Sequence, residues 1–267
     1  MSLQTDVARP VRPLPELLDA LRDRGLRKGL AAGPISPTGA GREALPTGQP
    51  SLDDALRTGG WPRGSLAFLD ATPGSGATSL VLGSLAACQA SGGVVAYLDP
   101  AGSLDPATAA RLGVNLDWLL IVRPADAVEA VELAGWLARD RSVDALVLDL
   151  ADAGALGGRP LDRLAGLLLR SGAVALLLAG GASVRAAEQA AGLRVALRRS
   201  AWLAVGRDLV GQRVEATVAR HRWALAGGRA ELDLFFAEGR RIDAQLRAAA
   251  VPQETLVELP ALRVVSA

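Results

Sequence analysis

"ATPGSGATS", residues 71–79, is the stretch of this sequence that comes closest to a phosphate-binding loop. The pattern of such a loop is G-x-x-x-x-G-K-[ST]. Ala71 stands where the pattern has its first glycine, and Ala77 stands where it has its lysine. The stretch follows a strand-like run, "LAFLD", and precedes a helix that we expect to begin near Ser79, which is the context that a phosphate loop requires. This context disfavours a chance turn and leaves either a nucleotide site or a relic of one.

The loop keeps most of the residues that hold a phosphate. Gly74 and Gly76 permit close approach to the backbone, and the start of the following helix carries about half a positive charge. Thr78 supplies the hydroxyl that contacts magnesium in working loops, and Ser79 follows it. A charge-assisted hydrogen bond of the kind that the missing lysine makes contributes about 1.5–3 kcal/mol to binding. These four residues therefore predict a relic or a weak phosphate and magnesium site.

Composition excludes several classes of function. The chain has 267 residues, half of them hydrophobic, which is enough for one large core, and its formal net charge is +1. Cys88 and His221 are the only cysteine and histidine, so an internal disulfide and a zinc cluster are excluded. The first residues lack the apolar core of a signal peptide, and no uncharged apolar run reaches ~18 residues. We expect a cytoplasmic protein with no membrane span.

Between residues 46 and 240, continuous apolar runs alternate with helical patterns. "VVAYLD", "VDALVLDL" and "AVALLLAG" predict buried strands, whereas "VEAVELAGWLARD" and "PLDRLAGLLLRSG" predict helices. This alternation predicts an α/β fold with a mostly parallel, twisted sheet that helices cover on both faces. "RVEATVARHRWALA" and "AELDLFFAEG" predict longer, antiparallel strands at the edge of the sheet.

The core is flanked by two shorter segments. Residues 1–45 predict an amphipathic helix, with leucines at 14, 17, 18 and 21, and a linker rich in glycine and proline. The helix packs either on its own core or against another subunit, and both readings stay open. Residues 241–267 form a tail in which Pro260 favours an extended peptide over a helix. We expect the tail to bind a partner through Leu256, Val257, Leu259 and Leu262.

Residues 46–240 resemble the core of RecA-type recombinases in many segments that occur in the same order. "TGQPSLD", "GGWPRG" and "LAFLDA" match the segment, the hairpin and the strand that lead into the RecA phosphate loop, and "VVAYLDPAGSLDPATAARLGVNLDWLLIVRP" follows the next part. "SVDALVLDL" resembles the Walker B strand, which implies that Asp149 occupies the acidic position on the magnesium side. Asp149 either holds a magnesium-bound water or is a relic acid, hydrogen-bonded to loop amides or to Thr78.

The departures from RecA bear on catalysis. The resemblance places Ala77 at the lysine of the loop, Ala101 at the glutamate that activates water and Gly180 near the glutamine that senses the terminal phosphate. Three catalytic elements are therefore missing, and the resemblance implies that the chain is not an enzyme. The loops that bind DNA in RecA correspond to short segments here, "ADAGALGGRP" and "GGASVRAAEQAAGLR".

A RecA-like chain without catalytic residues resembles the ImuA family, whose members work in SOS mutagenesis and translesion synthesis. This resemblance implies a non-catalytic DNA repair accessory protein that contacts an ImuB-type Y-family polymerase homologue. RecA and an error-prone replicative-type polymerase are the further partners that it implies, with weak or indirect DNA binding and no required cofactor. The alternative is a nucleotide-binding switch or weak ATPase that holds ATP or ADP weakly and binds single-stranded DNA.

Two further patterns suggest surfaces. Arg194, Arg198 and Arg199 lie around an expected helix or turn, in the region where RecA contacts DNA. Contacts to phosphates would make such binding weak, non-specific and sensitive to salt, and a solvated arginine face is the alternative. "ELDLF", residues 231–235, resembles the peptide that docks on the sliding clamp, but the alternation of Leu232 and Leu234 favours a core strand.

Overall fold

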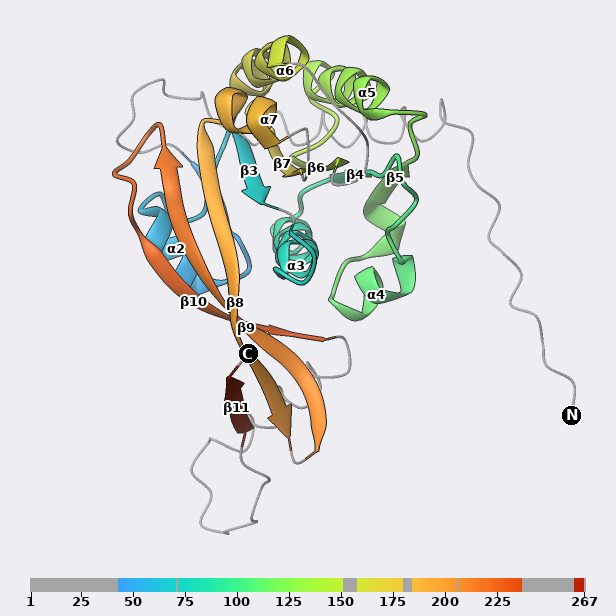
Figure 1. Cartoon of the computed structure of the whole chain (residues 1–267). Coiled ribbons are helices and arrows are strands. Elements are labelled where there is room, and N and C mark those ends of the chain that lie inside the picture. Colours follow the sequence, from blue (N-terminus) through green and yellow to red (C-terminus); the bar gives the residue numbers. More distant parts are fainter. Residues whose placement is uncertain are drawn as a thin grey trace, which may run out of the picture.

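One large sheet organises the molecule. The structure, a computed structural model, describes residues 43–70, 72–150, 158–179, 184–205, 207–236 and 262–266. The strands of the large sheet in chain order are β3 Leu66–Asp70, β4 Val95–Leu98, β5 Leu119–Val122, β6 Ala145–Leu150, β7 Val174–Ala179, β8 Leu193–Val205, β9 Asp208–His221, β10 Arg229–Phe235 and β11 Leu262–Ser266. Their spatial order is β10-β9-β8-β3-β7-β6-β4-β5, with β11 paired to β8 (Figure 1).

The two halves of this sheet differ in direction. The pairs from β8 through β3, β7, β6 and β4 to β5 are all parallel. The pairs of β8 with β9 and of β9 with β10 are antiparallel. β6 and β7 are buried along their whole length, as expected of strands covered on both faces. The mostly parallel α/β fold with antiparallel edge strands is therefore confirmed.

Helices cover both faces of the sheet, and the sheet separates the core into two hydrophobic clusters. One face carries α2 Pro50–Leu56, α3 Ala77–Ala90 and α4 Pro106–Arg111, with the short 3-10 helix η1 Leu116–Trp118 following α4. The other face carries α5 Ala127–Arg139, α6 Gly158–Ser171 and α7 Val184–Ala190, which form the upper layer in Figure 1. The phosphate-loop stretch lies on the same side of the sheet as α3, and the buried side chains of β9 and β10 pack on that side too.

Helix α3 begins at Ala77, two residues earlier than the sequence predicts. Gly76 stands just before it in a left-handed conformation, with φ of 86°, which glycine adopts without steric cost. Its carbonyl oxygen accepts the first hydrogen bond of the helix, from the Leu80 amide at 3.0 Å. Thr78 and Ser79 therefore belong to the first turn of α3 and not to the loop before it.

Strand β8 corrects the expectation of a helix or turn around Arg194, Arg198 and Arg199. It runs for 13 residues, and buried Leu193, Val195 and Leu197 alternate with more exposed residues. This period of two is the pattern of a strand. The arginines between the buried residues make the pattern hard to recognise from composition alone.

A small two-stranded sheet braces the entry to the core. It pairs β1 Ala44–Leu45 with β2 Trp61–Pro62, and Trp61 is fully buried. The indole nitrogen of Trp61 donates to the Ser84 hydroxyl at 3.0 Å, and that hydroxyl donates to the Thr47 carbonyl oxygen at 2.7 Å. These bonds attach "TGQPSLD" to α3, which fixes the helix that follows the phosphate-loop stretch.

Residues 262–266 add β11 to the sheet as an antiparallel neighbour of β8, with Leu262 opposite Val205. The extended conformation predicted for the tail is therefore confirmed at these five residues. The predicted N-terminal helix and residues 256–260 of the tail lie outside the described residues. In the part of the chain that the structure describes, no helix is long and apolar enough to cross a membrane.

Candidate functional site

The phosphate-loop stretch forms a tight turn between β3 and α3. Gly74 and Gly76 both have positive φ, and the Ser75 amide donates to the Thr72 carbonyl oxygen at 2.9 Å. The Thr72 hydroxyl donates to the Asp70 carboxylate at 3.0 Å, which fastens the loop to the end of the strand. Two glycines in the left-handed region suit a loop whose amides turn toward one centre. The positive φ of both residues explains why the sequence has glycine at positions 74 and 76.

The centre of the loop is occupied by a side chain of the protein itself. Gln212 of β9 is buried, with 5% of its surface exposed. In the amide orientation that satisfies both of its polar atoms, its nitrogen donates to the Gly74 carbonyl oxygen at 3.2 Å and its oxygen accepts from the Gly76 amide at 3.1 Å. The amides of a phosphate loop are the groups that hold phosphate oxygens. Gln212 therefore takes the Gly76 amide that an anion would need.

Apolar residues of the antiparallel strands close the same space. A Cβ atom added to Gly76 would lie 2.6 Å from the end of the Gln212 side chain, 2.6 Å from Leu234 and 3.2 Å from Val214. With φ of 86°, a residue with a side chain would be strained here, and these neighbouring side chains would also have to shift. Ala77, at the lysine position, has only 4% of its surface exposed and belongs to the core.

A cation stands beside the loop, but it comes from β8. The Arg199 guanidinium lies over the ring of Trp202, 4.2 Å from its centre. A Cβ added to Gly74 would lie 3.0 Å from one of the terminal nitrogens of Arg199. The Nε atom of Arg199 is buried and has no hydrogen-bond partner among the described residues. Arg199 thus gives the loop a positive neighbour that the missing lysine would otherwise supply.

Asp149 lies near the end of β6 and has 9% of its surface exposed. Its carboxylate accepts a hydrogen bond from the Tyr97 hydroxyl at 2.7 Å and a longer one from the Ser103 hydroxyl at 3.5 Å. Burial, followed by the negative charge of Asp149, raises the pKa of Tyr97 far above its ordinary value. Tyr97 therefore stays a protonated donor, and it is the partner of Asp149 that the sequence did not suggest.

The other positions that the sequence singles out lie on several different elements. β7 separates β3 from β6, so the loop and Asp149 leave the sheet about 10 Å apart across the strands. The Ala101 side chain is exposed, and Gly180 lies outside the described residues. Thr78 is exposed and Ser79 half-buried in the first turn of α3. Among the described residues no three His, Cys, Asp or Glu side chains gather as they would around a metal.

The three candidate DNA-binding arginines do not form one surface. Arg194 pairs with Glu188 of α7 at 2.6 Å and lies over the Phe68 ring, on the α7 side of the sheet. Arg198 pairs with Glu215 across the β8–β9 ladder. Arg199 faces the phosphate-loop side. Two of the three are therefore neutralised by carboxylates, which favours the solvated-face reading over a DNA contact.

"ELDLF" lies in β10, as the alternation predicted. Leu232 and Leu234 are buried, with 0% and 4% of their surface exposed. A peptide that docks on another protein needs these two leucines free, so the clamp reading is wrong. Of the candidate partner-binding residues in the tail, Leu256, Val257 and Leu259 lie outside the described residues, and the backbone of Leu262 pairs with Val205.

Sequence comparison identifies the family of this chain. The model of the RecA N-terminal domain matches residues 36–159. Protein RecA of Leifsonia xyli subsp. xyli (strain CTCB07) is 30% identical over 253 residues, which cover 81% of this chain and 70% of that protein. Protein RecA of Clavibacter michiganensis subsp. michiganensis (strain NCPPB 382) is 31% identical over 250 residues and is covered to 69%. In Protein RecA of Bifidobacterium breve, the chain spans 59% of the length.

Structural comparison agrees with the sequence. The crystal structure of the RadB recombinase matches with a TM-score of 0.55 and 21% identity, and the match covers 71% of this chain and 95% of that one. At this identity the likeness shows the fold alone. The identity to these two RecA proteins, together with the phosphate-loop stretch between β3 and α3 and the acidic residue on β6, shows that the chain belongs to the RecA family.

Proposed function

We propose that this chain is a non-catalytic, RecA-like accessory protein of DNA damage tolerance, of the ImuA type. It acts by protein contacts with an ImuB-type Y-family polymerase homologue, and RecA and an error-prone replicative-type polymerase are further partners. The observation that carries the non-catalytic part is the Gln212 side chain, which holds the Gly74 carbonyl oxygen and the Gly76 amide where a phosphate would bind. In addition, alanines at positions 77 and 101 replace the lysine and the glutamate that would act on a bound nucleotide.

Steady-state ATP hydrolysis tests the catalytic part of the proposal. We expect no turnover above a protein-free blank, with or without single-stranded DNA, because neither a loop lysine nor a water-activating glutamate is present. Turnover that DNA stimulates and that Asp149→Ala abolishes would overturn the proposal.

The partner part of the proposal requires a separate experiment. The full chain, purified from cells that also express the ImuB-type polymerase homologue and RecA of the same organism, should retain the polymerase homologue through washing. Recovery of the chain without either protein contradicts the accessory role, whatever the ATPase result.

The second candidate function is a nucleotide-dependent switch. It is favoured by the two glycines in the left-handed conformation and by Arg199 beside the loop. A ligand of this site must displace the Gln212 amide, so exchange of Gln212 for nucleotide would be the switching step. Equilibrium binding of a fluorescent ATP analogue separates the candidates. A non-catalytic accessory protein should bind the analogue no better than a non-specific control protein such as albumin, whereas a switch should show saturable binding.

A further inference from the structure

A groove lined by both apolar and charged side chains runs between α5 and α6, on the face of the sheet opposite the phosphate-loop stretch. It has a volume of about 420 Å³ and lies between two helices of 13 and 14 residues. Val128, Val131, Leu164 and Leu167 line it. Gly135 deepens it, because a Cβ there would approach Leu167 to 3.1 Å and would hold the two helices farther apart.

The exposed side chain of Trp136 indicates that this groove is a binding surface and not only a contact between two packed helices. Its side chain lies at the edge of the groove and 71% of its surface is exposed, and Val128 is 46% exposed. An exposed tryptophan at an apolar groove loses contact with water only if something covers it. Tryptophan and arginine are also the residues that most often dominate the binding energy of an interface.

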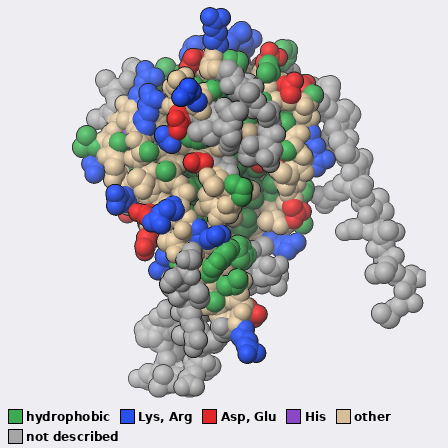
Figure 2. All heavy atoms as spheres, viewed as in Figure 1, with side chains coloured by type: hydrophobic (Ala, Val, Ile, Leu, Met, Phe, Trp, Pro, Cys, Tyr) green, Lys and Arg blue, Asp and Glu red, His purple; other side chains and the backbone are tan. Residues whose placement is uncertain are grey.

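The rim of the groove is positively charged. Arg139, Arg159 and Arg163 line it, against a single acidic residue, Glu132. None of the three arginines forms an ion pair with another described residue, in contrast to Arg194 and Arg198 of β8. In Figure 2, basic side chains stand at the top of the molecule, where the helix layer with α5 and α6 lies in Figure 1.

We propose that this groove binds an amphipathic helix of a partner protein that carries leucine-type residues on one face and acidic residues beside them. The two flanking helices make a groove about 20 Å long, which accommodates about 13 residues of helix. A helix laid into a groove with apolar anchors at i, i+3 or i+4 and i+7 is a recurrent mode of recognition. The acidic residues of the partner would meet Arg139, Arg159 and Arg163, which lack partners of their own among the described residues.

This surface is independent of the phosphate-loop stretch and of the proposed role in damage tolerance. It lies on the opposite face of the sheet, so loss of nucleotide binding leaves it intact. The partner is specified by its chemistry alone, and the proposal stands or falls on binding by that chemistry.

Fluorescence anisotropy with a designed peptide tests the proposal on the full chain. The probe is a labelled 16-residue helix with leucines on one face and glutamates on both flanks, and two further peptides carry serine for the leucines or lysine for the glutamates. We expect saturable binding of the first peptide alone, weakened by salt because the arginines contribute. Trp136→Ala should weaken it about tenfold or more, and the double variant Arg159→Glu/Arg163→Glu should abolish it.

Matched controls remove a residue of the same kind elsewhere. Leu225 is as exposed as Trp136, and Arg229 is an exposed arginine at the start of β10, so Leu225→Ala and Arg229→Glu should bind the probe as the unchanged chain does. All variants are compared by thermal melting, and Trp136→Phe, which keeps an aromatic ring, should bind with an intermediate affinity.

Three outcomes overturn the proposal. Equal binding of the probe to the Trp136→Ala variant places its site elsewhere. Binding that begins only when the leucines of the N-terminal segment are changed, as in Leu17→Asp/Leu21→Asp, identifies that segment as the occupant. A shift from dimer to monomer in sedimentation caused by Trp136→Ala identifies a second copy of the chain as the occupant.

Discussion

At the scale of single residues, Gln212 and Ala77 decide what the phosphate-loop stretch does. The two hydrogen bonds of the Gln212 amide contribute about 0.5–1.5 kcal/mol each, and they must break before an anion can bind. Gln212→Ala should therefore raise the affinity for a fluorescent ATP analogue, whereas Ala77→Lys alone should not. Lysine at the buried Ala77 position should instead lower the melting temperature. If Ala77→Lys binds nucleotide as well as Gln212→Ala does, Gln212 does not block the loop.

Variants of the hydrogen-bonded pair Tyr97 and Asp149 test whether Asp149 is a relic acid or a magnesium ligand. Tyr97→Phe removes a 2.7 Å donor from a buried carboxylate and should lower the free energy of unfolding by about 1–3 kcal/mol. The Asp149→Asn variant should make the Tyr97→Phe change less harmful, as a double-mutant cycle in urea would show. If Asp149 is a magnesium ligand instead, 5–10 mM magnesium chloride, roughly the excess that saturates a weak site, will raise the melting temperature of the unchanged chain.

At the scale of elements, the single histidine, His221 at the end of β9, makes the stability of the fold depend on pH. The Nδ1 atom of His221 accepts hydrogen bonds from the amides of Trp223 at 3.1 Å and Ala224 at 2.9 Å, so it must be unprotonated. Burial lowers the pKa of His221 below its ordinary value of 6.5. The unfolded chain then binds the proton first, and stability is full above about pH 6.5 and falls as the pH decreases through the lowered pKa.

Urea unfolding at pH 7.5 and pH 5.5 measures this dependence. The unchanged chain should be less stable at pH 5.5, and the difference should shrink in His221→Asn, which cannot take up the proton. An equal loss in both proteins would assign the pH dependence to carboxylates instead.

Elements differ in how far the sequence predicts them. The run that became β7 is apolar throughout and the run that became β6 is apolar except for Asp149, so local sequence suffices to predict buried parallel strands. The turn between β3 and α3 follows from Gly74 and Gly76, whose conformation few other residues adopt. Gln212 was beyond prediction because it reaches the loop only through the register of β9 with β8 and β10, where it lies opposite Trp202 and Leu234. Tyr97 and Asp149 likewise meet only because β4 and β6 are neighbours.

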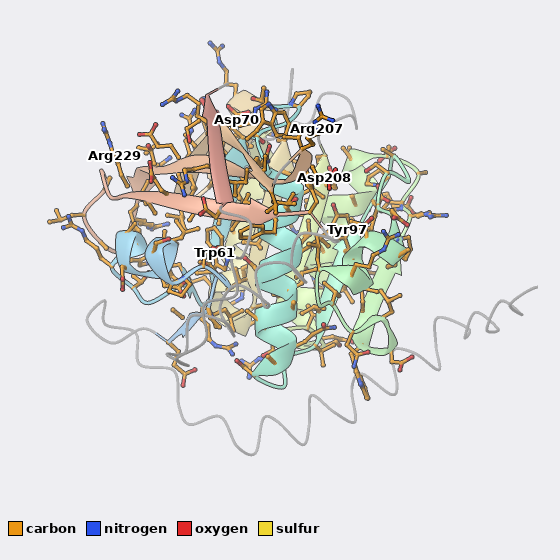
Figure 3. The ribbon with its side chains drawn as sticks, turned by 90° about the horizontal axis from the view of Figure 1, so that it is seen from below. Trp61, Asp70, Tyr97, Arg207, Asp208 and Arg229 are labelled. Atoms are coloured by element: carbon orange, nitrogen blue, oxygen red, sulfur yellow. The ribbon has the colours of Figure 1, made fainter. Side chains whose placement is uncertain are left out.

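At the scale of the whole molecule, the sheet has a compact part and an extended part. Figure 3 shows α3 running alongside the sheet, with Tyr97 on its far side from Trp61 and with Arg207 and Asp208 at the turn between β8 and β9. In Figure 1 this turn stands away from the helix layers, and β11 lies beside it. β3 pairs with β8 only at residues 193–195, so over residues 201–205 the neighbours of β8 are β9 and β11.

Removal of the tail tests whether the extended part is an independent unit. Deletion of residues 250–267 takes away β11 and leaves the backbone groups of residues 201–205 open on one side, as at the edge of a sheet. Because the described members of both hydrophobic clusters lie in other elements, the melting temperature should change little. Amide exchange at residues 201–205 should accelerate, while exchange in β6 and β7 should not, because local opening precedes global unfolding. If the tail also binds the polymerase homologue, the deletion abolishes co-purification with a folded core. A deletion that unfolds the chain would show instead that β11 holds the sheet together and that the partner surface lies elsewhere.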